Sequence, residues 1–526
     1  MPIDPRQLPD DPEILRKIVV DLTVQLESGH KRLAKVERLL EQLLEAKTGR
    51  RSEKLSPDQL ALFEAELKAQ GLETAGLETA PVSTTDADDD DTDDGKAGGG
   101  ADGERQSKRT GRRPLPPHLK RERIVHDLAD QEKHCRECDQ GLRAIGEETS
   151  ERYEFIPAQL LVVEEVCLKY ACGCTIRTAT KPSQPIEKST AGASLLAAVI
   201  VAKHADHLPV HRQVKMFRRS GVEFSDQTLC GWMGQSADLL QPLYERLKRF
   251  VLSSVVVGTD DTPVKVLDRA WNKTRRGRIW PYRGDRDHPA VVFDYTPTRE
   301  RAGPQKFLAG YRGPYLQADA YAVYDRFFND PQRGLLENGC MSHARRHFRD
   351  ALSSDRARMS VVLALIAQLY RVESMARKTN LDVEQVRLAR EHGARPVLNQ
   401  MHGYLLRIRE EVLPKSEAAQ AIGYALNHWT ALTRYCDDGR LAIDNNATER
   451  ALRGFAIGRN NWMFFGSDRG GRIAAVLRSF VVSCELVKAD PFAWFRDVLR
   501  RIGEHPLSKL DELLPHRWAE AQQPAR

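Results

Sequence analysis

The chain has 526 residues, of which 41% are hydrophobic, so it is long enough for several domains that each bury a core. No run of about 18 apolar residues is present, and the first residues, MPIDPRQLPDD, lack a signal-peptide pattern; a membrane protein is excluded and a cytoplasmic one is expected. The formal net charge is +6, yet residues 72–104 hold eleven acids against Lys96 alone. Setting aside that local charge of −10 leaves +16 for the rest, which indicates a nucleic-acid partner.

Residues 1–70 are predicted to form a helical coiled-coil region. Apolar residues recur at alternating spacings of four and three from Leu15 to Leu43, and Gly29 is the one interruption. A seam this narrow favours burial against a second copy of the chain or a partner helix, and packing on the protein's own body is the alternative. From 71 to 107 the composition turns to Ala, Gly, Thr and Asp, which is typical of a disordered acidic linker.

Residues 108–185 are expected to form a zinc-finger-like DNA-binding module. Two closely spaced thiol pairs can converge on one structural Zn²⁺ ion, and unrelated buried thiols are the alternative. Nine cysteines in a chain of this length do not form a disulfide framework. The thiol pairs are Cys135 with Cys138 and Cys172 with Cys174. A basic cluster opens the module, for which DNA phosphates and simple solvation are both open: Lys108, Arg109, Arg112 and Arg113.

Residues 186–248 carry helical periodicity with Gly221 between two segments, which predicts a helix-turn-helix-like domain. The second helix is expected to begin near Ser225 with polar residues suited to base edges. Three basic residues precede it and suit phosphate contacts: Lys215, Arg218 and Arg219. A plain helical domain without DNA contacts is the alternative.

Two buried strands are predicted to end in acidic residues. The β-branched run SSVVVGTDDTPVKVL carries Asp260 and Asp261, and the apolar run GPYLQADAYAVYD carries Asp319. An acid at the C-terminal edge of a strand is where open α/β sheets place their ligands. The segments RGRIWPYRGD and HPAVVFDYTPTR predict the next two strands of a meander, and LENGCM predicts a fifth strand.

A late helix is predicted to carry a third acid. The turn-prone Asp444-Asn445-Asn446 precedes a helical pattern that contains Glu449. Arginines on the same helix suit phosphates while the carboxylate suits a cation, and a surface helix with ordinary charge pairs is the alternative. These arginines are Arg450, Arg453 and Arg459.

The order Asp, Asp, Glu in these settings resembles the DDE transposases and integrases of the ribonuclease-H-like fold. The blocks TDDTPV, LQADAYAVYD and IDNNATERALRGFAIGRNNWMFFGSDRGG resemble signatures of the insertion-sequence transposases called family sixty-six, and the resemblance covers nearly the whole chain. That family has Asp-Glu-Thr-Pro where this chain has Asp260-Asp261-Thr262-Pro263. Asp260 is therefore the expected metal ligand, and Asp261 is the alternative.

The resemblance implies a multidomain α+β protein with a ribonuclease-H-like α/β catalytic domain over residues 249–480. An α-helical insertion is expected at about 350–440, and a C-terminal helical tail at 481–526. Two Mg²⁺ or Mn²⁺ ions would stabilise the attacking and leaving oxygens of DNA cleavage and strand transfer. Asp260 would bridge both ions, while Asp319 and Glu449 would hold one each.

Cys340 and His343 share a Cys-x-x-His signature with the family and are expected to support the site; a packed Cys with a hydrogen-bonded His is the alternative. The expected partners are double-stranded DNA, both transposon ends and target, and a second copy of the chain through the coiled coil. The resemblance also implies small accessory proteins of the same element, and a place in the bacterial cytoplasm with the DNA. A non-catalytic DNA-binding regulator and a metal-dependent nuclease that does not join strands remain the rivals.

Overall fold

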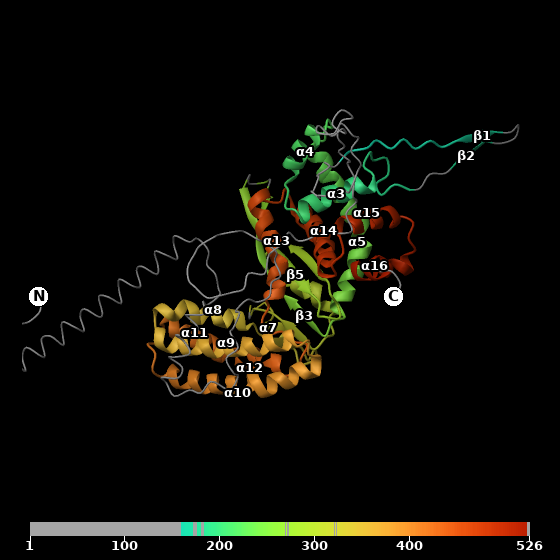
Figure 1. The fold of residues 1–526 in the computed structure, drawn as a ribbon. Helices are drawn as coiled ribbons and strands as arrows, with labels where there is room; N and C mark the ends of the chain where they lie inside the picture. Colours follow the sequence, from blue (N-terminus) through green and yellow to red (C-terminus); the bar gives the residue numbers. More distant parts are fainter. Residues whose placement is uncertain are drawn as a thin grey trace, which may run out of the picture. The chain divides into compact units, whose positions relative to one another are not determined.

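The computed structural model describes residues 159–171, 176–179, 183–268, 270, 273–319, 321 and 323–522 (Figure 1). The chain divides into two compact units, and the described residues up to 179 belong to one while those from 183 onward belong to the other. The expected coiled coil, the acidic linker, the basic cluster at 108–113 and the four cysteines of the expected zinc site lie outside the described residues.

The smaller unit contributes a short hairpin. Strands β1 (Lys169–Ala171) and β2 (Ile176–Thr178) pair antiparallel, with Lys169 opposite Thr178. The second expected thiol pair lies between these two strands in the sequence and outside the described residues.

The larger unit begins with the expected helix-turn-helix order. Helices α3 (Ala193–His204) and α4 (Val210–Arg219) precede α5 (Asp226–Leu252). Gly221, at φ +80°, occupies the turn in a conformation that favours glycine, and Ser225 caps α5 by accepting a hydrogen bond from the Thr228 N–H at 3.0 Å. The start predicted for this helix is confirmed. Beyond its first turns α5 continues as a long helix that packs on α14 and β6.

A mixed six-stranded sheet follows. Its strands are β3 (Val256–Thr259), β4 (Thr262–Asp268), β5 (Lys273–Arg283), β6 (Val291–Thr296), β7 (Tyr315–Gln317) and β8 (Leu336–Asn338). β5 pairs antiparallel with β6 on one side and with β3 and β4 on the other. β7 runs parallel to β3, and β8 runs parallel to β7. The strands predicted after Asp260 are thus present, in the order β6, β5, β3, β7, β8 across the sheet.

One strand was not expected as a separate element. The sequence predicts a strand that ends at Asp260-Asp261, and β3 does end just before them, but the chain resumes at once with β4, to which the sequence assigned no separate strand. β4 alternates buried Val264 and Val266 with exposed Lys265, because only one of its faces packs on the core. The two aspartates therefore stand at the end of β3, as predicted, and directly before a further strand.

Four helices end the described part of the chain: the first two pack on the sheet, and the last two pack on the second of them. These are α13 (Asn446–Trp462), α14 (Asp468–Leu486), α15 (Pro491–Arg501) and α16 (Pro515–Gln522). The Ser479 and Ser483 hydroxyls of α14 accept hydrogen bonds from the Phe293 and Val291 N–H groups of β6 at 2.8 and 3.1 Å. α14 therefore satisfies polar groups of an edge strand that would otherwise invite further pairing.

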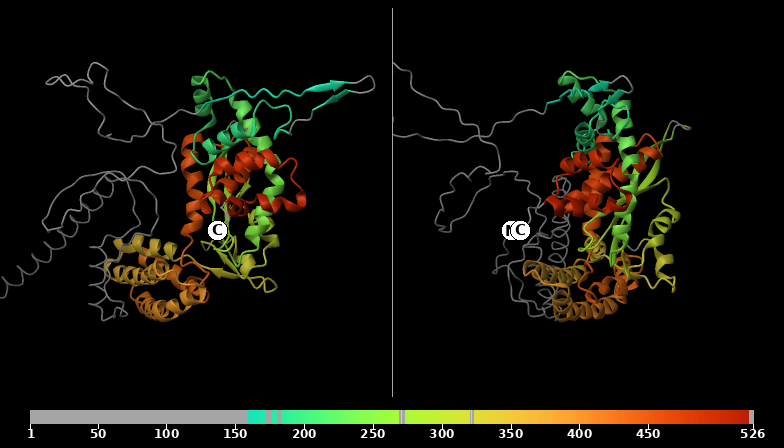
Figure 2. Two further views of the ribbon diagram at one scale, coloured as in Figure 1. Left: turned by 45° about the vertical axis from the view of Figure 1, so that its right-hand side comes forward. Right: turned by 90° about the vertical axis from the view of Figure 1, so that its right-hand side faces the viewer.

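Between β8 and α13 the chain forms a bundle with its own hydrophobic core (Figures 1 and 2). Its helices are α8 (Met341–Asp350), α9 (Arg356–Lys378), α10 (Val383–Arg409), α11 (Glu417–Asn427) and α12 (Trp429–Thr433). Arg390 pairs with Glu373 at 2.7 Å and donates to the Tyr435 and Asp438 carbonyls, which fixes the segment leading to α13. Among the described helices, α9 alone is long and apolar enough to span a membrane, but 67% of its apolar window is buried. It is a core helix of this bundle.

Candidate active site

Two parallel strands bring the first two acidic positions together. Val256, Val257 and Gly258 of β3 lie opposite Tyr315, Leu316 and Gln317 of β7. All four residues of β3 are buried, as the β-branched sequence predicts, so the chain first meets solvent at Asp260. Asp319 follows β7 at the same edge, because parallel strands end on the same side of a sheet.

The negative charges of both other acids act on the Asp260 carboxyl group. Its pKa is raised to about 7, mainly by burial and also by the negative charges of Asp319, Glu449 and Asp261, against the hydrogen bond that the Asp261 N–H donates to it at 2.7 Å. Asp319 and Glu449 are thus close enough to Asp260 to act on its ionisation. Three carboxylates gathered at a partly buried place repel one another unless a cation neutralises them.

Asp261 has a different role. Its side chain is 3% exposed, and it accepts hydrogen bonds from Arg278 at 2.6 Å and from Arg299 at 2.8 and 3.1 Å. Both carboxylate oxygens are therefore used by guanidinium groups. Arg299 also lies over the Tyr321 ring, 3.8 Å from its centroid, which holds the guanidinium beside the site.

Glu449 reaches the site because the start of α13 lies directly on β3. The Asn445 side chain, 1% exposed, donates to the Thr259 carbonyl at 2.9 Å. A Cβ at Gly258 would meet the Thr448 hydroxyl at 2.4 Å, so glycine is what allows this close approach. Glu449 then stands in the first turn of α13, where a carboxylate is favoured by the helix dipole. The expected turn at Asp444–Asn446 is confirmed.

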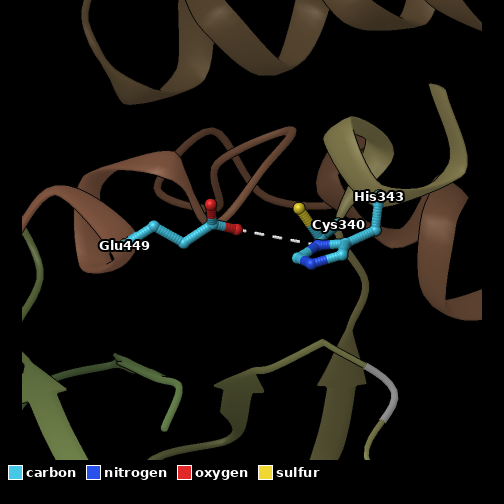
Figure 3. Close-up of side chains that lie close together, drawn as sticks. All are labelled: Cys340, His343 and Glu449. Carbon is cyan, nitrogen blue, oxygen red and sulfur yellow. Dashed lines mark ion pairs between the residues drawn. The ribbon is translucent and has the colours of Figure 1, made fainter. Parts of the chain in front are cut away.

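Cys340 and His343 face Glu449 from the start of α8 (Figure 3). His343 Nδ1 lies 3.7 Å from Glu449 Oε1, and donor atoms of all three residues lie within 4.8 Å of one another. Burial raises the pKa of the Cys340 thiol to about 12, and its sulfur accepts a hydrogen bond from the Asn445 N–H at 3.2 Å. The structure thus adds the Glu449 carboxylate to the Cys-x-x-His pair.

The chemistry of the donor set suits divalent cations. Asp260, Asp319 and Glu449 offer the oxygen ligands that Mg²⁺ and Mn²⁺ prefer, and the raised pKa of Asp260 reflects negative charge that a cation would offset. Cys340 and His343 offer softer atoms beside Glu449.

The other predicted site residues fall into two groups. The N-terminal basic cluster and the zinc cysteines lie outside the described residues. The remaining basic residues lie on two helices: Lys215, Arg218 and Arg219 are exposed on α4, and Arg450 and Arg453 are exposed on α13. Arg459 instead donates to Thr262 and Pro263 of β4, at 3.2 and 3.1 Å, which ties α13 to the sheet.

Sequence reasoning missed the arginines that hold Asp261, as well as the contacts of Gly258 and Asn445. One signal for Arg278 was present, since it is a charged residue inside the otherwise apolar strand sequence RIWPY. A charged residue in such a strand indicates a partner of opposite charge. Nothing in the sequence indicates that Gly258 and Thr448 meet.

Family models match most of the chain. One described as "Transposase IS66 family" matches residues 188–473, and one described as "IS66 C-terminal element" matches 479–516. The "zinc-finger binding domain of transposase IS66" matches 132–174, and the "Transposase C of IS166 homeodomain" matches 36–124.

Two relatives from Sinorhizobium fredii match over most of their length. The uncharacterized protein y4jD is 33% identical over 443 residues, which cover 79% of this chain and 85% of the relative. The uncharacterized protein y4hP is 32% identical over 438 residues, which cover 79% of this chain and 78% of the relative.

Proposed function

Because the chain belongs to the IS66 transposase family, we propose that it binds the terminal inverted repeats of a mobile DNA element and catalyses metal-dependent strand cleavage and strand transfer. The observation that carries this proposal is the convergence of Asp319 and Glu449 on the half-buried Asp260 carboxyl group. Membership of the family identifies a DNA-acting transposase with DNA-binding modules. We propose that it works in the bacterial cytoplasm, on the DNA.

The proposed catalytic core is ribonuclease-H-like. Three antiparallel strands, β6, β5 and β3, followed by the parallel strands β7 and β8, support this assignment. So does the position of the acids, at the ends of the two adjacent parallel strands and on a helix that packs against the sheet. The helical bundle between β8 and α13 corresponds to the proposed insertion at about 350–440.

The proposed chemistry is substitution at phosphorus. Two Mg²⁺ or Mn²⁺ ions held by the carboxylates would stabilise the attacking and leaving oxygens. Asp260 would be shared by both ions, and Asp319 and Glu449 would hold one each. Asp261 is excluded from this role in the proposal because two arginines occupy its oxygens. Asp261 instead fixes the break in the chain on which Asp260 stands.

Cys340 and His343 are proposed to orient Glu449. The imidazole limits the positions open to the carboxylate, and the Cys340 sulfur holds the Asn445 N–H just before α13. With its pKa raised to about 12, Cys340 is a neutral thiol at physiological pH, which suits a structural role better than metal binding.

The test is a cleavage and joining assay on duplex DNA taken from the ends of the element, with Mg²⁺ and its accessory proteins. Glu449→Gln, Asp260→Asn and Asp319→Asn should each abolish nicked and joined products while DNA binding persists, since each removes a charge that the cation needs. Asp261→Asn is the matched control: it makes the same change one residue away. It should reduce cleavage far less than the three changes above and cost about 1.5–3 kcal/mol of folding stability.

The products separate the rival functions. Nicked DNA without joined DNA would indicate a nuclease, and binding with neither product would indicate a regulator. If Glu449→Gln cleaves at the parent's rate, Glu449 is not the third ligand. If Asp261→Asn loses cleavage while Asp260→Asn keeps it, Asp261 is the metal ligand and Asp260 is not.

DNA binding is proposed to rest on other residues. Lys215, Arg218 and Arg219 form an exposed basic face on α4, and the N-terminal residues Lys108, Arg109, Arg112 and Arg113 are proposed to bind further phosphates. Arg218→Ala with Arg219→Ala should weaken binding and reduce the slope of log affinity against log salt by up to about one for each phosphate that is no longer neutralised. An unchanged slope would show that α4 does not touch DNA.

A further inference from the structure

Large apolar side chains gather on the surface at the C-terminal end of α13. Ile457 is 45% exposed, Met463 is 64% exposed and Phe464 is 39% exposed. Single exposed apolar residues are common, but three within eight positions form a patch of the kind that marks an interaction site. The same helix carries Glu449 at its other end.

The backbone at this patch is strained. Met463 has φ +62° and ψ −47°, and the Phe464 N–H donates to the Trp462 carbonyl at 2.7 Å. These values describe a γ-turn of the rare, strained kind. It is centred on a methionine, although glycine adopts this conformation with less strain. Strain of this sort persists only when the surroundings impose it.

Contacts on both sides impose the turn. Before it, the Met463 N–H donates to the Arg459 carbonyl at 2.9 Å; after it, Phe465 pairs with β4 through Lys265 and Leu267 at 2.9 and 2.8 Å. The Trp462 and Phe465 rings stack across the turn with centroids 4.5 Å apart. The turn is therefore clamped between α13 and β4, and Met463 is held out in solvent.

Basic side chains lie along α13 and on the strand that pairs with Phe465 beside the turn. Arg450 and Arg453 lie on the exposed face of α13 together with Ile457, at spacings of three and four residues. Lys265 of β4 is exposed and pairs across the sheet with exposed Arg276. Asp468, the next acid along the chain, is held by Arg275 and Tyr295. Positive charge beside the apolar patch fits duplex DNA, which is anionic outside and apolar between its stacked bases.

We propose that Met463, backed by Phe464 and Ile457, is a wedge that inserts between two base pairs of the bound DNA and opens that step. Apolar side chains of this type kink DNA from the minor groove. Fourteen residues of helix separate Met463 from Glu449, a length of about 21 Å. At about 3.4 Å per base pair, the opened step lies about six base pairs from the cleaved phosphate.

The wedge is joined to the proposed DNA-binding helices. The Asn461 side chain donates to the His207 carbonyl at 3.1 Å, and His207 lies in the connection between α3 and α4. DNA held on the basic face of α4 is thus held by a body that also carries the turn at Met463. The position of the opened step relative to the cut rests on the proposed function, but the insertion itself does not.

The experiment uses the full-length protein and a duplex of the element's terminal sequence, with 2-aminopurine placed at successive positions. The parent should raise the fluorescence several-fold at one step, about six base pairs from the cut. Met463→Gly should abolish that rise and keep DNA binding, because glycine adopts this φ without strain and the phosphate contacts remain. Met463→Leu should keep the rise. Leu413→Gly, at a residue 79% exposed elsewhere, is the matched control and should also keep it.

Each outcome bears on the wedge. A rise that persists in Met463→Gly, or no rise in a parent that binds the duplex, overturns it. If Met463→Gly lowers the sedimentation coefficient without DNA, the patch is a protein contact and the wedge is wrong. Glu449→Gln should show the parent's fluorescence rise, since opening a step needs no chemistry. Loss of cleavage alone would therefore not affect the wedge, and loss of the rise alone would not affect the proposed catalysis.

Discussion

The Asp260 carboxyl group is about half protonated at pH 7 when no cation is bound, because its pKa is raised from 3.8 to about 7. Desolvation is the main cause, and the neighbouring carboxylates add to it. A cation bound there takes the place of the proton. Metal binding at this residue is therefore coupled to proton release, and affinity should rise with pH up to about pH 7.

The same shift predicts a pH-dependent stability for the metal-free protein. The folded state holds the Asp260 proton more tightly than the unfolded state. The stabilisation of the fold by this proton is therefore complete below about pH 4 and is lost as pH rises through about 7. Asp260→Asn removes this loss of stability. At pH 8 the free energy of unfolding of the variant should exceed that of the parent by roughly 2–4 kcal/mol. Denaturant unfolding in EDTA at pH 4 and pH 8 measures it.

Magnesium provides the control for that prediction. Adding Mg²⁺ at pH 8 should stabilise the parent more than Asp260→Asn, since the ion needs the carboxylate. Equal pH dependence of the parent and the variant in EDTA would show that Asp260 ionises normally in the folded protein.

At the scale of elements, the contact between β3 and α13 brings Glu449 close to Asp260 and Asp319. Gly258→Ala places a methyl group 2.4 Å from the Thr448 hydroxyl, so the first turn of α13 must move away from β3. We expect a loss of about 1–3 kcal/mol in stability and a larger loss of cleavage, because Glu449 moves with the helix. Unfolding and cleavage assays on the same preparation compare the two losses.

Two variants make the result specific to this contact. Gly423→Ala on α11 adds the same methyl group where nothing lies within 4 Å, and it should leave cleavage unchanged. Thr448→Ala removes the clashing oxygen, so the double variant Gly258→Ala with Thr448→Ala should recover part of the activity. No recovery would mean that Gly258 matters for another reason.

The sequence predicts elements well where a short segment carries its own signal. The β-branched run before Asp260, the apolar run before Asp319 and the turn at Asp444–Asn446 all precede acids in the structure as predicted. β4 was not predicted as a separate strand because only two residues separate it from β3, and Pro263 near its start argues against a strand there. The pairing of Asp261 with Arg278 and Arg299 could not be predicted, because it depends on the register between strands.

At the scale of the whole molecule, the zinc-finger match at residues 132–174 leads to a prediction about metal content. We expect one Zn²⁺ per chain, bound through Cys135, Cys138, Cys172 and Cys174. Elemental analysis of protein purified without chelator should find about one zinc, and Cys135→Ser with Cys138→Ser should remove it. A zinc-free parent with four freely titratable thiols at these positions would contradict this.

The heptad pattern predicts how copies of the chain associate. Leu33→Asp with Leu40→Asp should lower the assembly state, because charges in a coiled-coil seam cannot be buried. Sedimentation with and without DNA and accessory proteins measures this. Leu39→Asp with Leu44→Asp, outside the seam, is the matched control. An unchanged sedimentation coefficient in the seam variant would place the seam within one chain.

The late position of Glu449 has a consequence for protein synthesis. The DNA-binding segments, Asp260 and Asp319 leave the ribosome before the whole bundle α8–α12, and Glu449 comes only after it. A product that terminates before Asn445 would therefore keep its DNA-binding segments and two of the three acids, yet lack the means to cut. It would also lack α14 and α15, against which α3 packs, so the last part of the chain completes both the site and the support of the DNA-binding helices.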